Sequence, residues 1–109
     1  MRESQIQSAI LEYLAARHVL AFRMQTGAIK LEKRFIRFGV PGMADILACP
    51  QMLCDDGDWR PSFLWIEVKA GSRQSVLQRS FQEQVEEQGH RYIVAKSIDD
   101  VEAALRAIQ

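Results

Sequence analysis

The sequence predicts an α/β (α+β) fold in which a mixed sheet is flanked by helices. Two observations carry this prediction: hydrophobic spacings typical of helices and of strands follow one another along the 109 residues, and the short run 63–70 is apolar along one whole face. Successive side chains of a strand point to opposite faces, so such a run is typical of a strand buried under helices. We expect the order helix, strands, helix, strand, helix.

The first element is an amphipathic helix from Glu3 to about Arg17, because apolar residues recur there at helical spacing. A strand is expected at 19–25, and Thr26 with Gly27 is interpreted as a turn. Basic and apolar residues alternate over 34–38, which predicts another short strand. The apolar positions of the helix are Ile6, Ile10, Tyr13 and Leu14.

A loop at 39–42 leads into a strand at 44–48, and the acid-rich segment 50–61 has the weak apolar pattern of a loop or insertion. The strand 63–70 follows. A helix is predicted over 74–88, and Gly89 ends it. Its apolar row is Leu77, Phe81 and Val85.

A further strand is expected at 91–96. Ser97, with Asp100 three residues later, resembles a capping box and opens a last helix that ends near Ile108. No internal repeat and no interdomain linker is present, so 1–109 is predicted to be a single domain.

Composition excludes several classes of protein. Fourteen basic and fourteen acidic residues give a net charge of zero, which argues against diffuse electrostatic attachment to nucleic acid. No apolar stretch approaches the ~20 residues that span a bilayer, so no membrane association is expected. Cys49 and Cys54 are interpreted as reduced thiols, and the N-terminus lacks an apolar targeting core; both favour a cytoplasmic location. The two cysteines and two histidines lack zinc-type spacing.

Two carboxylates and a lysine are the candidate catalytic residues. Glu67 and Lys69 fall on one face of the strand 63–70, at its end, and Asp45 stands at the entrance of the strand 44–48, where it could converge on Glu67. Glu67 and Lys69 could instead be a charged pair on an exposed sheet face, and Asp45 a residue that ends a loop. However, a carboxylate in such apolar surroundings costs several kcal/mol unless a cation compensates it.

Carboxylates suit Mg²⁺ or Mn²⁺, which prefer oxygen ligands and share their coordination with water and phosphate. Such an ion would neutralise charge on a phosphate and lower the pKa of a bound water. Lys69 could position or deprotonate that water, and the backbone carbonyl of Val68 could complete the metal shell. The leading hypothesis is a metal-dependent phosphodiesterase.

A strip of cations lies between residues 28 and 38, where a single acid, Glu32, accompanies four basic residues. The strip is either a solvated hairpin edge or, beside a carboxylate site, a surface that contacts the phosphate backbone of DNA. Its members are Lys30, Lys33, Arg34 and Arg37.

Asp45 followed by Glu67-Val68-Lys69 resembles the signature of the PD-(D/E)XK nucleases. Nearly the whole chain resembles the VRR-NUC family in its small stand-alone phage and bacterial form, through the Glu3 helix, the loop 39–45, these motif residues and Gln78. Ala44 stands where that family usually has a proline. The resemblance implies a restriction-endonuclease-like fold with an αβββαβ core and an extra C-terminal helix. It also implies phosphodiester hydrolysis with a divalent metal, by homodimers that act on branched DNA such as four-way junctions.

Two further site residues depend on this resemblance. Gln78 falls on the helix side that faces the sheet, where a polar side chain needs a partner. It is either hydrogen-bonded to backbone near the helix start or a site residue that orients water or phosphate. Glu3 complements the dipole of the first helix, and the resemblance implies that it joins the metal site.

The sequence is thus interpreted as a homodimeric DNA endonuclease that uses Mg²⁺ or Mn²⁺. Two alternatives remain: a noncatalytic DNA-binding module with the same fold, and a sequence-specific restriction-type endonuclease, which would need side chains that read base edges.

Overall fold

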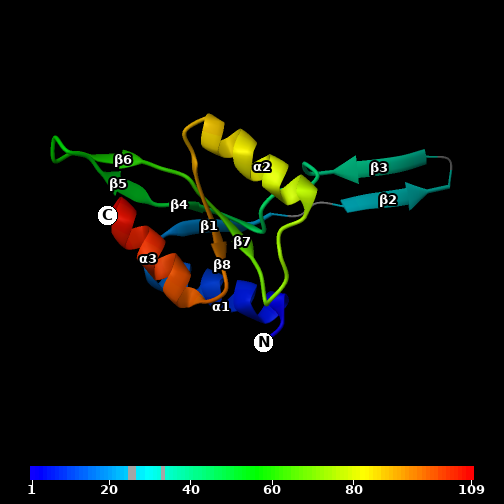
Figure 1. Cartoon of the computed structure of the whole chain (residues 1–109), viewed down its shortest axis with the longest axis horizontal. Helices are drawn as coiled ribbons and strands as arrows, with labels where there is room; N and C mark the ends of the chain where they lie inside the picture. Colours follow the sequence, from blue (N-terminus) through cyan, green and yellow to red (C-terminus); the bar gives the residue numbers. More distant parts are fainter. Residues whose placement is uncertain (25–26, 33) are drawn as a thin grey trace.

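The computed structural model describes residues 1–24, 27–32 and 34–109, and the side chains of 27–31 and 34–38 are not described. The elements of these ranges are drawn in Figure 1. The helices are α1 (Glu3–Ala16), α2 (Val76–Glu87) and α3 (Ile98–Ile108). The strands are β1 (Leu20–Arg23), β2 (Gly27–Leu31), β3 (Arg34–Phe38), β4 (Ile46–Cys49), β5 (Gln51–Leu53), β6 (Trp59–Pro61), β7 (Leu64–Val68) and β8 (Arg91–Ala95).

The central sheet is mixed, as the sequence predicts. Its strand order is β1-β4-β7-β8, and its pairs are antiparallel except β7 with β8, which run parallel. Parallel neighbours need a crossover connection, and α2 provides it. Without the hairpins β2–β3 and β5–β6, the element order is α1-β1-β4-β7-α2-β8-α3. This is the expected αβββαβ core with an extra C-terminal helix.

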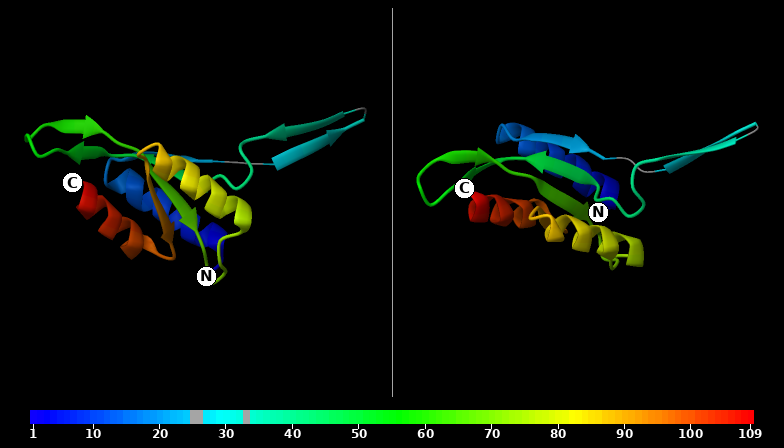
Figure 2. Two further views of the ribbon diagram at one scale, coloured as in Figure 1. Left: turned by 45° about the horizontal axis from the view of Figure 1, so that its top comes forward. Right: turned by 90° about the horizontal axis from the view of Figure 1, so that it is seen from above.

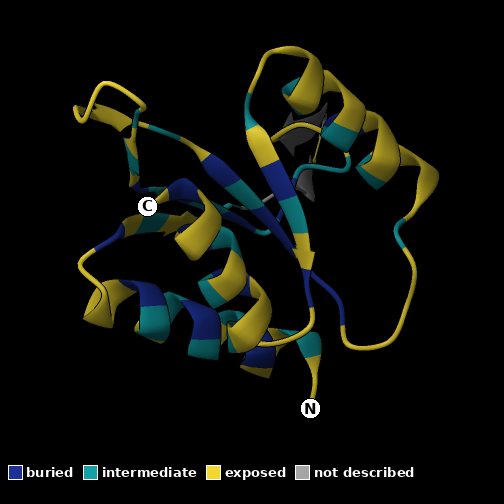
Figure 3. Ribbon diagram, turned by 60° about the vertical axis from the view of Figure 1, so that its left-hand side comes forward, coloured by how far each residue is buried: buried dark blue, intermediate teal, exposed yellow. Residues whose placement is uncertain are grey.

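Helices cover both faces of this sheet (Figure 2). Helices α1 and α3 pack on one face, where alternate residues of β7 meet the apolar rows of both helices in the main core. Helix α2 covers the other face through Phe81, whose ring meets Trp65 edge-on with centroids 5.0 Å apart. The residues drawn as buried in Figure 3 follow the central strands and the inner side of α1.

The first helix forms where its apolar spacing predicts it. Ile6, Ile10 and Leu14 lie one turn apart and are buried, and Tyr13 packs beside them. The last helix has the same pattern in Val101, Leu105 and Ile108. None of the helices in the described part of the chain is long and apolar enough to cross a membrane.

Two hairpins extend the molecule to 55 Å along its longest axis, against 31 and 24 Å along the others. Figures 1 and 2 show β2–β3 projecting from one end and β5–β6 from the other. The radius of gyration is 15.2 Å, whereas a compact chain of this length has about 13 Å. The projecting hairpins account for the difference.

Of two sequence predictions about these hairpins, one is wrong and the other is right in part. Gly27 does not turn the chain but begins β2, where it pairs with Phe38; Thr26 lies outside the described residues. The segment 50–61, predicted as a loop or insertion, is an insertion between β4 and β7 but not an irregular loop, because β5 and β6 pair from Gln51↔Pro61 to Leu53↔Trp59. Its acid-rich middle is the turn of that hairpin, closed by a hydrogen bond from the Cys54 amide to the Asp58 carbonyl. Strands of three residues are too short to show a period.

Two local predictions about helices are also wrong. Ser97 is the N-cap of α3, but its side chain accepts no capping hydrogen bond; Asp100 instead accepts one from the Lys96 amide at 2.8 Å. Leu77 is 57% exposed, whereas Phe81 is buried and Val85 partly buried as expected. In the first turn of α2, the backbone of Leu77 contacts Gly42, whereas the Leu77 side chain points into solvent.

Candidate active site

The candidate site lies where β7 ends beside the start of β4. Because these strands are antiparallel, with Ile46 opposite Ile66, the residue that precedes β4 reaches the last residues of β7. The carboxylate of Asp45 accepts a hydrogen bond from the Val68 amide through Oδ2 at 2.7 Å. The structure therefore brings Asp45 and Glu67 to one edge of the sheet.

Glu67 is only 2% exposed, and its two carboxylate oxygens are in different situations. Oε1 accepts a hydrogen bond from Nε2 of Gln78 at 3.1 Å. Oε2 is buried and has no hydrogen-bond partner among the residues that the structure describes. A buried oxygen without a partner costs free energy, so Oε2 calls for a proton or a cation.

The pKa of Glu67 reflects the same situation. Burial, and then the adjacent Asp45 carboxyl, raise the pKa of Glu67 to about 8. The charge of Lys69 acts in the opposite direction, and the charge of Glu3 raises the pKa further. Without a bound cation, the pair of carboxyls therefore tends to keep a proton near neutral pH.

Lys69 is 9% exposed, although no ion pair of the described chain includes it. Its amide donates to the Ala95 carbonyl at 3.0 Å, which continues the pairing with β8 beyond the last residue of β7. This pairing fixes the backbone at Lys69. An ammonium whose charge acts on Glu67, and which no ion pair of the described residues neutralises, can bind a phosphate oxygen or a water.

Gln78 joins the helix cap to the site. Its Oε1 accepts a hydrogen bond from the Ser75 amide, and its own amide donates to Ser75 Oγ at 3.1 Å; together these bonds form a capping box. Its Nε2 remains free to bind Glu67. The structure thus shows the predicted hydrogen bond to backbone near the helix start, together with a contact to Glu67; a role of Gln78 in orienting water or phosphate stays a prediction. The Ser-x-x-Gln spacing was a signal that could have identified Ser75.

The loop 39–45 approaches the same helix turn at Gly42, which has a φ of +79°. A Cβ atom at Gly42 would collide with the Leu77 carbonyl group and lie 2.8 Å from the Gln78 nitrogen. Glycine is therefore required twice, for its backbone conformation and for the close approach. This contact sets the distance between the Asp45 loop and the helix that carries Gln78.

Glu3 and Val68 lie at the margin of the site. Glu3 is half-buried in the first turn of α1, whose N-terminal end lies near the end of β7 in Figure 1, and its charge acts on Glu67. The Val68 side chain is buried in the main core, so only its backbone faces the site. Within the described ranges, no three His, Cys, Asp or Glu side chains converge on one point, so the acidic centre is the pair Asp45 and Glu67.

This donor set fits a hard divalent cation. The two carboxylates offer only oxygen atoms, and Oε2 of Glu67 is buried without a partner among the described residues. Mg²⁺ and Mn²⁺ are bound in this way, through one or two carboxylates plus water and phosphate oxygens.

Three of the four cations of the predicted basic strip belong to the hairpin β2–β3, which projects from the body of the molecule (Figure 2). Lys30 is in β2, and Arg34 and Arg37 are in β3; their side chains are not described. Lys33 lies outside the described residues. The structure therefore places the backbone of Lys30, Arg34 and Arg37 on a projecting arm.

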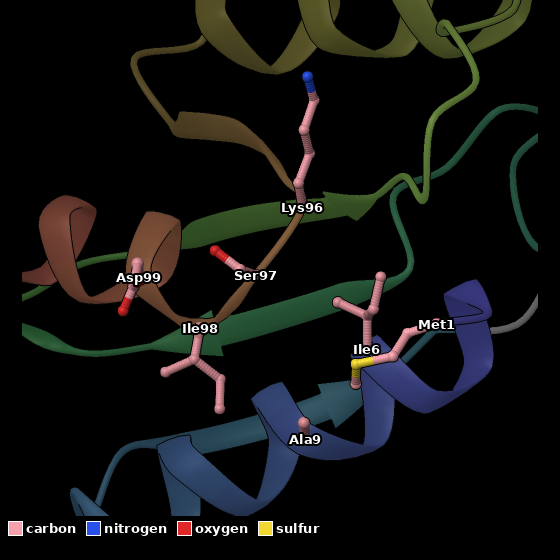
Figure 4. A pocket seen from close by; sticks show the side chains of 7 residues that line it. All are labelled: Met1, Ile6, Ala9, Lys96, Ser97, Ile98 and Asp99. Carbon is pink, nitrogen blue, oxygen red and sulfur yellow. The ribbon is translucent and has the colours of Figure 1, made fainter.

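A cavity of about 270 Å³ lies below the same edge of the sheet, between the N-terminal turns of α1 and α3 (Figure 4). Ile6, Ala9 and Ile98 give it a mainly apolar lining. The Lys96 side chain extends away from α1, toward the side of the sheet that α2 covers.

Comparisons with known proteins give one similar structure. No protein-family profile matches the chain, and no curated protein matches it. A solved structure described as a VRR_NUC domain is similar over 95% of this chain and 94% of the other, with a TM-score of 0.60 and 19% sequence identity. The chain therefore has the fold of a VRR_NUC domain, and the resemblance seen in the sequence is confirmed at the level of the fold.

Proposed function

We propose that this chain, which has the fold of a VRR_NUC domain, is a DNA endonuclease that hydrolyses phosphodiester bonds with Mg²⁺ or Mn²⁺. The observation that carries the proposal is the buried pair Asp45 and Glu67, with Oε2 of Glu67 unpartnered among the described residues and the Lys69 ammonium beside it. A purely structural carboxylate pair would be expected to have its oxygens satisfied by hydrogen bonds.

Each residue has a role that follows from its contacts. The Val68 amide orients Asp45 and the Gln78 amide orients Glu67, and each of these bonds uses one oxygen of its carboxylate. A divalent cation bound there would neutralise charge on the phosphate and lower the pKa of a water. Lys69 holds the water or a phosphate oxygen by its positive charge. Glu3 tunes the site through its charge on Glu67.

The substrate and the assembly form a second part of the proposal: branched DNA, such as a four-way junction, cut by a homodimer. An isolated two-stranded hairpin is marginally stable in water, and β2–β3 projects from the body. Its sequence is rich in apolar residues between the cations, which supports burial of this arm against a second copy or along DNA. A symmetric pair would supply one active site for each of two strands.

The test is cleavage of a panel of labelled DNA molecules by purified protein, with Mg²⁺, Mn²⁺ or EDTA. The panel contains linear duplex, single strand, flap and four-way junction. The proposal predicts metal-dependent cleavage, fastest on branched DNA. A matched control is Glu83→Gln, which changes an exposed acid of α2 and should leave the rate unchanged. DNA binding without cleavage under any condition would instead support the noncatalytic DNA-binding module, and sedimentation at several concentrations tests the homodimer.

A further inference from the structure

A polar cavity beside the candidate active site has no role in the function proposed above. It has a volume of about 410 Å³ and is lined by Ser72, Arg73, Gln74, Arg79 and Val94. The loop that joins Lys69 to α2 forms one wall, Arg79 of α2 forms another, and the edge strand β8 contributes Val94.

Sheet register places this cavity next to Glu67. Val94 is the register partner of Glu67 in the parallel pair β7–β8, so the two side chains share the face of the sheet that α2 covers. Neighbouring strands are about 4.8 Å apart. One wall of the cavity therefore belongs to the strand next to the one that carries Glu67.

The two arginines of the cavity have no partner of opposite charge among the described residues. Within that part of the chain, neither Arg73 nor Arg79 belongs to an ion pair, and neither side chain donates a hydrogen bond. Arg79 and Glu83 stand four residues apart on α2 but do not pair. Two guanidinium groups without an ion-pair partner among the described residues, together with a serine in the same cavity, can bind an anion. Guanidinium groups bind phosphate through two parallel hydrogen bonds.

The loop that carries Arg73 is held in place by its neighbour. The Nε2 atom of Gln74 donates to Tyr92 Oη and to Gln82 Oε1, both at 3.0 Å. Tyr92 packs against Phe81 in the smaller core. Lys96, beyond Val94 at the end of β8, extends to the same side of the sheet (Figure 4) but does not line the cavity.

We propose that this cavity binds a phosphate of the DNA backbone next to the phosphate that is cleaved, with Arg73 and Arg79 as its ligands. The inference rests on the proposed nuclease function and adds a subsite to it. Together with the carboxylate pair, the subsite fixes the direction of the strand across the site, because two adjacent phosphates are held at two different positions.

The test measures DNA binding in the inactive background Glu67→Gln, with Arg73→Ala, Arg79→Ala and, as control, Arg106→Ala. Arg106 is paired with Glu102 on α3, and its substitution removes the same charge away from the cavity. We expect roughly tenfold weaker binding for each cavity variant and a salt slope smaller by about 0.9 for duplex DNA. The control should retain the slope and the affinity. Arg73→Lys keeps the positive charge but cannot form the two parallel hydrogen bonds of a guanidinium group, so it should bind DNA with intermediate affinity.

A second measurement identifies the phosphate. The cut is first mapped with active protein, and uncharged methylphosphonate linkages are then placed one at a time within three nucleotides of it. One such linkage should weaken binding by the protein with both arginines and have no further effect on Arg73→Ala. If every linkage weakens both proteins equally, or if the cavity variants bind as the control does, the subsite is refuted. Absence of cleavage by the unmodified protein would refute the proposed function instead.

Discussion

The contact between Gly42 and the first turn of α2 leads to the most quantitative prediction. Gly42→Ala imposes two costs: alanine at a φ of +79° is strained, and its methyl group collides with the Leu77 carbonyl group. Gly57→Ala is a matched control, because Gly57 has a φ of +86° and a methyl group there would meet no atom of the described residues within 4 Å. The difference between the two variants isolates the collision.

The magnitudes follow from general values. A left-handed backbone costs a residue other than glycine about 1–2 kcal/mol, and overpacking costs about 1–3 kcal/mol. We expect Gly57→Ala to lower the free energy of unfolding by about 1 kcal/mol. Gly42→Ala should lower it by at least about 1 kcal/mol more, which corresponds to a further fall in Tm of roughly 4 °C.

Urea unfolding, followed by the fluorescence of the partly buried Trp65, measures both variants. A displaced α2 turn also moves Gln78 away from Glu67, so Gly42→Ala should reduce cleavage whereas Gly57→Ala should not. Equal unfolding midpoints for the two variants would refute the close approach of the loop to the helix.

Three further predictions concern the charged residues. In metal-free protein, the pKa of Glu67 is about 8 when folded against about 4.5 unfolded, so its contribution to stability is complete below pH 4.5 and is lost as the pH rises through 8. The free energy of unfolding should fall by up to about 1.4 kcal/mol per pH unit in this window. Urea unfolding at several pH values should show a smaller fall for Glu67→Gln. If both proteins lose stability equally with rising pH, the buried environment assigned to Glu67 is contradicted. Lys69→Met should abolish cleavage while calorimetry still detects Mn²⁺ binding, because the lysine acts on water or phosphate; loss of metal binding would contradict that role. Lys33→Ala with Arg34→Ala, measured at several salt concentrations in the Glu67→Gln background, should lower the salt slope by roughly one unit per lost contact, whereas a solvated edge predicts no change.

Much of the fold could be predicted because its long elements have clear periods. The helix that carries Ile6, Ile10 and Leu14 buries one face, and the strand that ends at Val68 lies buried between helices. In both, burial fixes the hydrophobic pattern. The hairpin β5–β6 could not be predicted in this way. Its strands are short and mostly exposed, so no buried face imposes an alternating hydrophobic pattern on their sequence.

The candidate site was predictable in its residues and not in its geometry. Alternation along β7 indicates that Glu67 and Lys69 share a face, but no local pattern encodes the antiparallel pairing that brings Asp45 to them. The close approach of Gly42 to α2 likewise depends on tertiary packing. The cavity with Arg73 and Arg79 is formed from a loop, a helix and an edge strand, and only the folded chain brings these together.

The most direct test of the central claim is the single-turnover cleavage rate of Glu67→Gln, measured beside the unmodified protein on a four-way junction with saturating Mn²⁺. The substitution keeps the shape of the side chain and removes one carboxylate of the pair. If Asp45 and Glu67 hold the catalytic metal, the rate should fall by at least about 100-fold while the metal-free protein remains folded and no less stable. A rate within about twofold of the unmodified protein would contradict the account, because Glu67 would then lie outside the reaction.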